Sequence, residues 1–316
     1  MMRTRIFFAA VAIMAFSGSS RAAHPLVLMT DFGQKDGAVC EMKGVIMGVD
    51  PQLRVTDLTH EIPNFDIWEA SYRLGQAIHY WPSGTVFVSV VDPGVGTDRN
   101  SIVAELKDNG SGRIYSIVTP NNGTLTLLLE SMSLVRLHDL EEEKNRLPEG
   151  SMYHTFHGRD LYAFTGARLA AELIGISDVG QPFPAESLVL LDYQKCETKE
   201  GKIIGIIPVL DTTFGNVWSN ISVDHFKSLG IATDSRIDVT IHKRTPEGME
   251  KIWSGTVPLK NTFGDVPVGQ ELAYVNSLEQ LALAVNQGNF AGAHKIASGR
   301  DWIITVVPTR AGTTRN

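Results

Sequence analysis

The sequence predicts an α/β protein: a mainly parallel N-terminal sheet with helices on both faces, followed by a smaller, mostly antiparallel β domain. Up to about residue 173, short apolar runs alternate with segments of helical periodicity, and after about residue 200 strand-like runs dominate. Alternating strands and helices are typical of parallel sheets covered on both faces, whereas successive strands favour antiparallel pairing.

The N-terminal domain is expected at 24–183. Its first strand, 26–29, is entirely apolar and is followed by a helical pattern through Met42, Ile46 and Val49. The other expected elements are strands at 54–58, 85–91, 114–118 and 134–137, and helices at 67–80 and at about 160–173.

The C-terminal domain is expected at 190–310, after a linker-like Gln-Pro-Phe-Pro segment at 181–184. Two prolines within four residues cannot continue a regular element and therefore indicate a boundary. The expected strands are 202–210, 236–241, 272–275 and 302–307, and the one expected helix is 278–285.

Composition limits the classes of partner. The chain has 316 residues, 43% of them hydrophobic, which is enough for two domains. Lys plus Arg is 28 and Asp plus Glu is 35, so the net charge is 28 − 35 = −7. An acidic chain without a basic block is not expected to bind nucleic acid.

Residues 1–22 are interpreted as a signal peptide. Arg3 and Arg5 precede an apolar run at 6–16, and a small-x-Ala site ends at Ala22. The run is too short to span a bilayer, so we expect cleavage, export to the periplasm or medium, and no stable membrane insertion afterwards. Cys40, within an expected helix, is interpreted as a buried apolar residue, and pairing with Cys196 remains open.

Polar residues follow two of the buried strands. Asp31 and Asp92 each come directly after an apolar run, and ligands of open parallel sheets bind beyond the carboxyl ends of the strands. Both could instead cap turns. The segment 92–99 has Gly94 and Gly96 but no phosphate-loop pattern. We expect its glycines to let the loop fold back and bring Arg99 toward Asp92.

Two further groups have alternative interpretations. His154 and His157 are three residues apart, which suggests a metal, but the sequence offers no matched ligand set, so no metal is predicted. Asp211, Asn216 and Asn220 flank two aromatic residues. These residues could be part of a core, or could bind a planar base through stacking and amide hydrogen bonds.

Five segments together resemble one family. They are TDFG at 30–33, DPGVGTDR at 92–99, PNNG at 120–123, TFHGRD at 155–160 and the stretch 211–220. They are similar to those of the S-adenosyl-L-methionine (SAM) hydroxide adenosyltransferases, relatives of the fluorinase and chlorinase. The resemblance implies a C-terminal β-barrel-like domain and a homotrimer with active sites between the N-domain of one subunit and the C-domain of the next.

The resemblance also implies roles for individual residues. Asp92, Arg99 and His157 match the set that holds the attacking water, Asp31 matches the carboxylate on the ribose hydroxyls, and Phe65 falls where an aromatic ring covers the ribose and sulfonium. The remaining matches are Asp36 and Asp211 near the methionine amine, Phe214, Asn216, Trp218 and Phe263 in the adenine pocket, and Ser277 near the methionine carboxylate.

The implied reaction is hydrolysis of SAM to adenosine and L-methionine, without metal or cofactor. The halogenases carry Tyr in place of Asp92, Arg in place of Leu278 and, in the fluorinase, Ser in place of Gly158. A carboxylate repels halide and accepts a hydrogen bond from water, so a halogenase is disfavoured. An exported adenosyl-compound binding protein without turnover remains an alternative. A methyltransferase fits poorly because no Gly-x-Gly loop follows the first strand.

Overall fold

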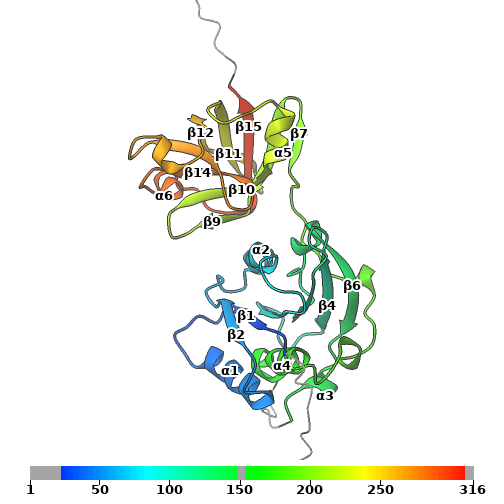
Figure 1. The fold of residues 1–316 in the computed structure, drawn as a ribbon. Helices are drawn as coiled ribbons and strands as arrows, with labels where there is room; N and C mark the ends of the chain where they lie inside the picture. Colours follow the sequence, from blue (N-terminus) through cyan, green and yellow to red (C-terminus); the bar gives the residue numbers. More distant parts are fainter. Residues whose placement is uncertain (1–22, 149–153, 310–316) are drawn as a thin grey trace, which may run out of the picture.

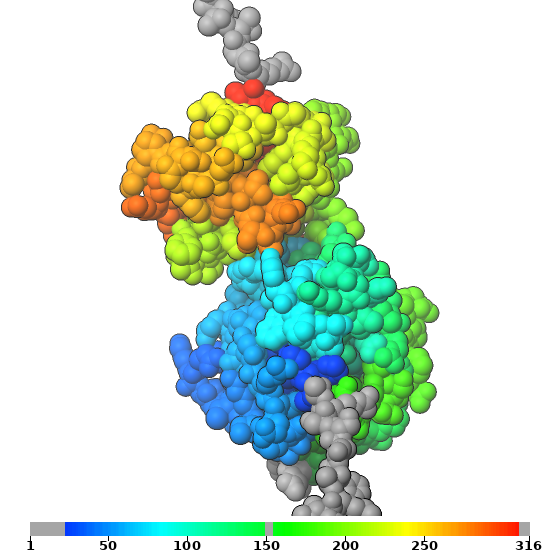
Figure 2. All heavy atoms as spheres, viewed as in Figure 1, coloured from blue at the N-terminus to red at the C-terminus, as the bar shows by residue number. Residues whose placement is uncertain are grey.

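The computed structural model describes residues 23–148 and 154–309, so the predicted signal peptide lies outside the described residues. An α/β N-terminal part and a β-rich C-terminal part form two distinct bodies that meet at a narrower waist (Figures 1 and 2). Within the described ranges, no helix combines the length and the apolar character needed to cross a membrane.

One six-stranded sheet forms the centre of the N-terminal part. Its strands are β1 (Leu26–Thr30), β2 (Val55–Thr59), β3 (Val86–Val90), β4 (Ser101–Asp108), β5 (Ile114–Pro120) and β6 (Met132–Asp139), in the order β2-β1-β3-β5-β4-β6. The neighbouring strands β2, β1, β3 and β5 pair in parallel, whereas β4 is antiparallel to both of its neighbours, β5 and β6. The sheet is therefore mixed, with its parallel half on the side of β1 and β3.

Helices cover both faces of this sheet, as predicted. The longer ones are α1 (Ala38–Val49), α2 (Ile67–Ile78) and α4 (Phe164–Ala170), the last preceded by a π-helical segment, η2 (Gly158–Ala163). Alternate residues of β1 face opposite ways: Leu28 clusters with Met42 and Ala167, whereas Met29 clusters with Leu74 of α2. Short helices complete this part: η1 (Leu128–Glu130), α3 (Glu142–Asn145), η3 (Ile176–Asp178) and η4 (Ala185–Ser187).

The C-terminal part consists of two antiparallel sheets around one core. One sheet has the order β13-β14-β10-β9 and the other β12-β11-β15-β8-β7. The core between them takes Val217 and Leu283 from the first sheet and Ile237 and Ile304 from the second. Among the described residues an isolated bridge between Leu259 and Ala273 joins the two sheets, but no closed barrel is formed. The barrel-like expectation is therefore corrected to two packed sheets.

The elements of this part have the following bounds: β7 (Glu197–Lys199), β8 (Lys202–Ile207), β9 (Val209–Asp211), β10 (Asn216–Ser222), α5 (Val223–Ser228), β11 (Arg236–Thr245), β12 (Gly248–Pro258), η5 (Phe263–Asp265), β13 (Glu271–Val275), β14 (Gln280–Val285), α6 (Phe290–His294) and β15 (Gly299–Pro308).

Three sequence expectations were wrong. The segment 278–285 is not a helix, because its apolar run is the central strand β14, whose Leu283 and Ala284 belong to different clusters on its two faces. Such a run cannot be distinguished from a buried helix by periodicity alone. The strand expected at 202–210 is two strands separated at Pro208, which has no N–H to donate. Cys40 is exposed rather than buried, and both cysteines are free.

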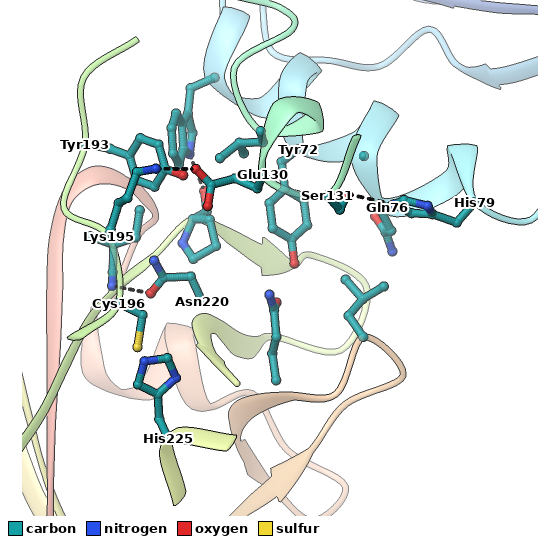
Figure 3. Close-up of a pocket in the computed structure, with 17 residues that line it drawn as sticks. Tyr72, Gln76, His79, Glu130, Ser131, Tyr193, Lys195, Cys196, Asn220 and His225 are labelled. Carbon is teal, nitrogen blue, oxygen red and sulfur yellow. Dashed lines mark hydrogen bonds and ion pairs between the residues drawn. The ribbon is translucent and has the colours of Figure 1, made fainter. Parts of the chain in front are cut away.

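Helix α2 of the N-terminal part makes hydrogen bonds to the C-terminal part. Trp68 donates its indole N–H to the carbonyl of Pro208 at 2.9 Å, and Arg73 donates to the carbonyl of Leu210 at 3.0 Å. A cavity of about 520 Å³ lies beside this contact, with Tyr72 on one side and Asn220 on the other (Figure 3). Within the described ranges, none of the residues that the resemblance assigns to the active site lines this cavity, whereas Asn220, considered for a planar base, does.

Asp108, at the end of β4, stabilises the turn to β5. Its carboxylate accepts hydrogen bonds from the backbone N–H groups of Gly110 and Ser111 at 2.8 and 3.1 Å, and lies 2.7 Å from Nδ1 of His79 at the end of α2. Although burial works in the opposite direction, these bonds hold the pKa of Asp108 at about 2. The carboxylate therefore links helix α2 to the sheet in its ionised form.

We expect Asp108→Asn to lower the free energy of unfolding at pH 6 by roughly 1 kcal/mol, because a neutral amide accepts weaker hydrogen bonds than the carboxylate. Because the pKa of Asp108 is lower in the folded than in the unfolded state, its ionised carboxylate stabilises the folded protein at pH values above the unfolded-state pKa. This stabilisation is lost as the pH falls toward about 2. Urea titrations should therefore give a smaller difference between the variant and the wild type at pH 3 than at pH 6. Exposed Asp301→Asn is the control, and equal differences at both pH values would contradict the assignment.

Candidate active site

The parallel half of the sheet places two acidic residues at one edge. Asp31 follows β1 and Asp92 follows β3, and these two strands are neighbours. Between them lies a cavity of about 310 Å³, which we call the sheet-edge cavity. Of the residues predicted for the site, it is lined by Asp31, Asp36, Phe65, Asp92 and His157. The structure thus brings together five residues from four separate sequence segments.

Asp92 and Arg99 form a buried ion pair at this cavity. Nη2 of Arg99 lies 2.5 Å from Oδ2 of Asp92, whose side chain is 2% exposed. The other carboxylate oxygen, Oδ1, accepts the backbone N–H of Gly94 at 3.0 Å. Gly96 takes φ +77°, a left-handed conformation in which the loop can fold back. The loop therefore returns Arg99 to Asp92 as the sequence predicts.

His157 is a buried histidine without a hydrogen-bond partner among the described residues. It is 8% exposed, lines the cavity and directly precedes η2. Burial lowers the pKa of His157 below its usual range, as do the charges of Arg99 and Arg146, whereas Glu142 and Asp92 act in the opposite direction. The imidazole is therefore neutral at pH 7 and can accept a proton.

Glu142 is a neighbour of His157 that the sequence analysis did not identify. Its Oε1 lies 3.6 Å from Nε2 of His157 and 2.6 Å from Nδ1 of His154. Arg146, one helical turn along, donates to the same oxygen at 2.6 Å. Glu142 lies 15 residues before His157 with no motif between them, so only the fold reveals this contact.

The opposite wall of the cavity holds Asp31 and Phe65. Asp31 is 8% exposed, and its Oδ2 accepts the backbone N–H of Phe65 at 2.9 Å. Phe65 has φ +68°, a left-handed conformation that costs a bulky residue about 1–3 kcal/mol. The ring is 67% exposed at the rim of the cavity. The backbone is thus strained where it holds an aromatic ring over the site. Asp36, also at the rim, is exposed and accepts the N–H of Ala38.

Gly158 lies directly under the ring of Phe32. A Cβ atom at this position would be 2.9 Å from that ring and 3.1 Å from the ring of Phe156. Any side chain here would displace one of the two rings. Aromatic packing therefore closes this wall of the cavity, and leaves no room for the serine that the fluorinase carries in place of Gly158.

The other predicted residues lie on the C-terminal part and form a second group. Asn216 donates to Asp211 at 3.0 Å, Trp218 donates its indole N–H to Oη of Tyr274 at 3.3 Å, and the ring of Phe263 packs on Tyr274 at 4.8 Å between centroids. Phe214 is 66% exposed and Phe263 39%. These side chains form a polar and aromatic surface that suits a planar base.

The single chain does not bring the two groups together. Asp211, Trp218 and Ser277 line a separate cavity of about 740 Å³, together with Leu278 and residues of α2. None of the C-terminal group lines the sheet-edge cavity in the ranges that the structure describes.

We expect Arg99→Leu to lower the free energy of unfolding by about 3–5 kcal/mol, because it leaves the buried charge of Asp92 without a partner. The double variant Asp92→Asn/Arg99→Leu should lose less free energy of unfolding than Arg99→Leu alone, because no unpaired charge remains buried. Urea titrations of the variants and the wild type measure both values. Equal losses for the single and double variants would show that the ion pair does not stabilise the loop.

Comparison with known proteins identifies the family. The model of the SAM hydroxide adenosyltransferase N-terminal domain matches residues 26–180, and that of the C-terminal domain matches residues 205–303. The chain is 32% identical to the (R)-S-adenosyl-L-methionine hydrolase of Thermus thermophilus, over 87% of this chain and 97% of the relative. It is 26% identical to the fluorinase of an Actinoplanes species, over 90% of this chain and 97% of the fluorinase.

A solved structure of an uncharacterised conserved protein from Thermotoga maritima is also similar, with a TM-score of 0.78 and 30% identity over 89% of this chain and 99% of that one. The matched domain models and these relatives cover most of the described residues. The chain therefore belongs to the SAM hydroxide adenosyltransferase family, which is a family of enzymes.

Proposed function

We propose that this enzyme hydrolyses SAM to adenosine and L-methionine. The observation that carries the proposal is a buried carboxylate, Asp92, which pairs with Arg99 and lines the same cavity as the neutral His157. Relatives that are 32–35% identical and are named (R)-S-adenosyl-L-methionine hydrolase support the same activity.

The chemistry requires a nucleophile rather than a metal. In SAM the leaving group is a sulfonium, which departs as a neutral thioether without acid assistance. The oxygen of water attacks C5′ of the ribose in line, the C5′–S bond breaks, and its electron pair stays on sulfur as methionine leaves. One water proton must be removed. The protein therefore has to align a water molecule and accept its proton.

Each member of the set has a distinct task in this reaction. Asp92 accepts a hydrogen bond from the water and orients it, and Arg99 fixes the carboxylate so that it does not rotate away. His157, neutral at pH 7, takes the proton. A carboxylate at this position also repels halide ions, which supports water as the nucleophile.

The two groups of predicted residues divide the substrate between them. On the N-terminal part, Asp31 binds the ribose hydroxyls, Phe65 covers the ribose and sulfonium, and Asp36 lies near the methionine amine. On the C-terminal part, the proposed contacts are Phe214, Asn216, Trp218 and Phe263 with adenine, Asp211 with the amine and Ser277 with the carboxylate.

This division supports an assembly of several subunits. SAM must touch both groups at once, yet the single chain holds them in separate cavities. The aromatic rings that would contact substrate, Phe65 and Phe214, are both about two-thirds exposed in one chain, and exposed aromatic rings are typical of ligand sites and interfaces. We therefore propose a homotrimer whose active sites lie between the N-terminal part of one subunit and the C-terminal part of the next.

We further propose that residues 1–22 direct export, which places the enzyme in the periplasm or the medium. The cleaved chain would comprise the two predicted domains, 24–183 and 190–310. SAM is made in the cytoplasm, so the exported enzyme would act on SAM, or on a close relative of SAM, that has left the cell.

The first test is incubation of the purified protein with SAM, a chelator and no added halide. We expect adenosine and methionine in equal amounts, measured by chromatography, and a loss of at least about 100-fold in turnover for Asp92→Asn. Exposed Asp98→Asn, in the same loop, is the matched control and should retain activity. Binding of SAM by the wild type without formation of adenosine would instead favour the binding-protein alternative.

The shared active site has its own test. Asp92→Ala impairs the N-terminal group and Asn216→Ala the C-terminal group, so each variant alone should be inactive. Unfolding and refolding the two together in equal amounts should restore up to about a quarter of the wild-type activity, because random mixing pairs two intact halves at that frequency. If the mixture stays inactive while the wild type regains activity in the same procedure, the site belongs to a single chain.

A further inference from the structure

A second cluster of potential ligands lies at the edge of the catalytic set. The cluster consists of Glu142, at the start of α3, and of His154 and His157, before η2. Each offers one ligand atom, a carboxylate oxygen or an imidazole nitrogen, and the three atoms lie within 4.8 Å of one another. The sequence contains the two histidines three residues apart but gives no indication of the third ligand. The fold supplies it by bringing α3 alongside the segment before η2.

The donor set has the chemistry of a zinc site. Two neutral imidazoles and one carboxylate bind Zn²⁺ in several hydrolases, with a water molecule at the fourth position. Oε1 of Glu142 lies 2.6 Å from Nδ1 of His154 and 3.6 Å from Nε2 of His157. Separations of this size allow three atoms to surround one ion with only small side-chain movements.

An independent observation also points to a ligand. His157 is 8% exposed, yet neither of its ring nitrogens has a hydrogen-bond partner among the residues that the structure describes. Buried polar atoms without partners are rare in folded proteins and call for a bound group or a functional role. A neutral imidazole has one lone pair to offer, so the catalytic water and an ion would compete for it.

We propose that Glu142, His154 and His157 bind Zn²⁺, and that the bound ion inhibits the enzyme by coordinating His157. Coordination uses a lone pair of the imidazole and fixes the orientation of the ring. Because a neutral imidazole has only one such lone pair, the remaining nitrogen carries the ring proton and cannot accept a proton from water. The inhibitory role rests on the proposed hydrolase function, whereas the binding site itself does not.

The cluster is open to solvent on one side. The side chain of His154 is 58% exposed and that of Glu142 33%, whereas that of His157 is 9% exposed. An ion can therefore bind first to His154 and Glu142 and then reach His157. Arg146, which donates to Oε1 of Glu142 at 2.6 Å, must release that oxygen when the ion binds. Its charge opposes the ion, so we expect reversible inhibition rather than a permanent structural metal.

The binding test uses untagged protein freed of metal by a chelator. Co²⁺ is the probe, because its visible absorption reports coordination by nitrogen and oxygen ligands. We expect one Co²⁺ ion per chain, displaced by Zn²⁺. His154→Ala should weaken binding by more than about tenfold, whereas His225→Ala, a histidine outside the cluster that makes one side-chain hydrogen bond to Ser222, should leave it unchanged. Absence of binding to the wild type, or equal binding by His154→Ala, would overturn the site.

The inhibition test follows SAM hydrolysis at pH 7.5 while Zn²⁺ is added and then removed by chelator. We expect reversible loss of activity in the wild type and a shift of the inhibitory concentration by more than about tenfold in His154→Ala, which should keep its activity without metal. Co²⁺ bound without inhibition would overturn the regulatory role. If the metal-free enzyme shows no hydrolysis at all, the proposed function fails, while the Co²⁺ spectrum still decides whether the site exists.

Discussion

The burial of the Asp92 carboxylate is the constraint on which the site depends. A charge that is 98% shielded from solvent requires an opposite charge in direct contact, and Arg99 supplies it from the same loop. Arg99 also donates to the hydroxyl of Ser101, which is 2.8 Å from the hydroxyl of Tyr162 in η2. Burial raises the pKa of Tyr162 to about 12, so this hydroxyl stays protonated. One chain of polar contacts thus fixes both the loop with Asp92 and the helix that follows His157.

Much of the fold could be predicted because short apolar strands alternate with amphipathic helices. Both faces of β1 are buried, so the strand is a short run of apolar residues that ends at Thr30 and Asp31. Such a run clearly indicates a buried strand. The same logic failed for 278–285, where a central strand and a buried helix give the same apolar pattern. The reversal of β4 could not be predicted either, because strand direction depends on pairing with β5 and β6 rather than on its own residues.

Some residues of the site could likewise be predicted from the sequence, whereas others come together only through the packing of the fold. Asp31 and Asp92 follow strands directly, so their common edge of the sheet follows from the rule that ligands bind at the carboxyl ends of parallel strands. Glu142 could not be found by such reasoning, because it reaches His157 through the packing of α3. The left-handed conformation of Phe65, φ +68°, could not be predicted from the sequence either, because its N–H bonds to Asp31, 34 residues earlier in the chain.

The two proposed roles of His157 arise from a single physical property. An imidazole that burial keeps neutral has a free lone pair, which can accept a proton or bind Zn²⁺. A carboxylate nearby increases both tendencies, because it favours any positive charge on the ring, whether proton or metal. Arg146 counteracts this effect by neutralising Glu142. Its guanidinium lowers the affinity for an ion while leaving the proton acceptor in place, so the balance between catalysis and inhibition is set by the residue that competes for Oε1 of Glu142.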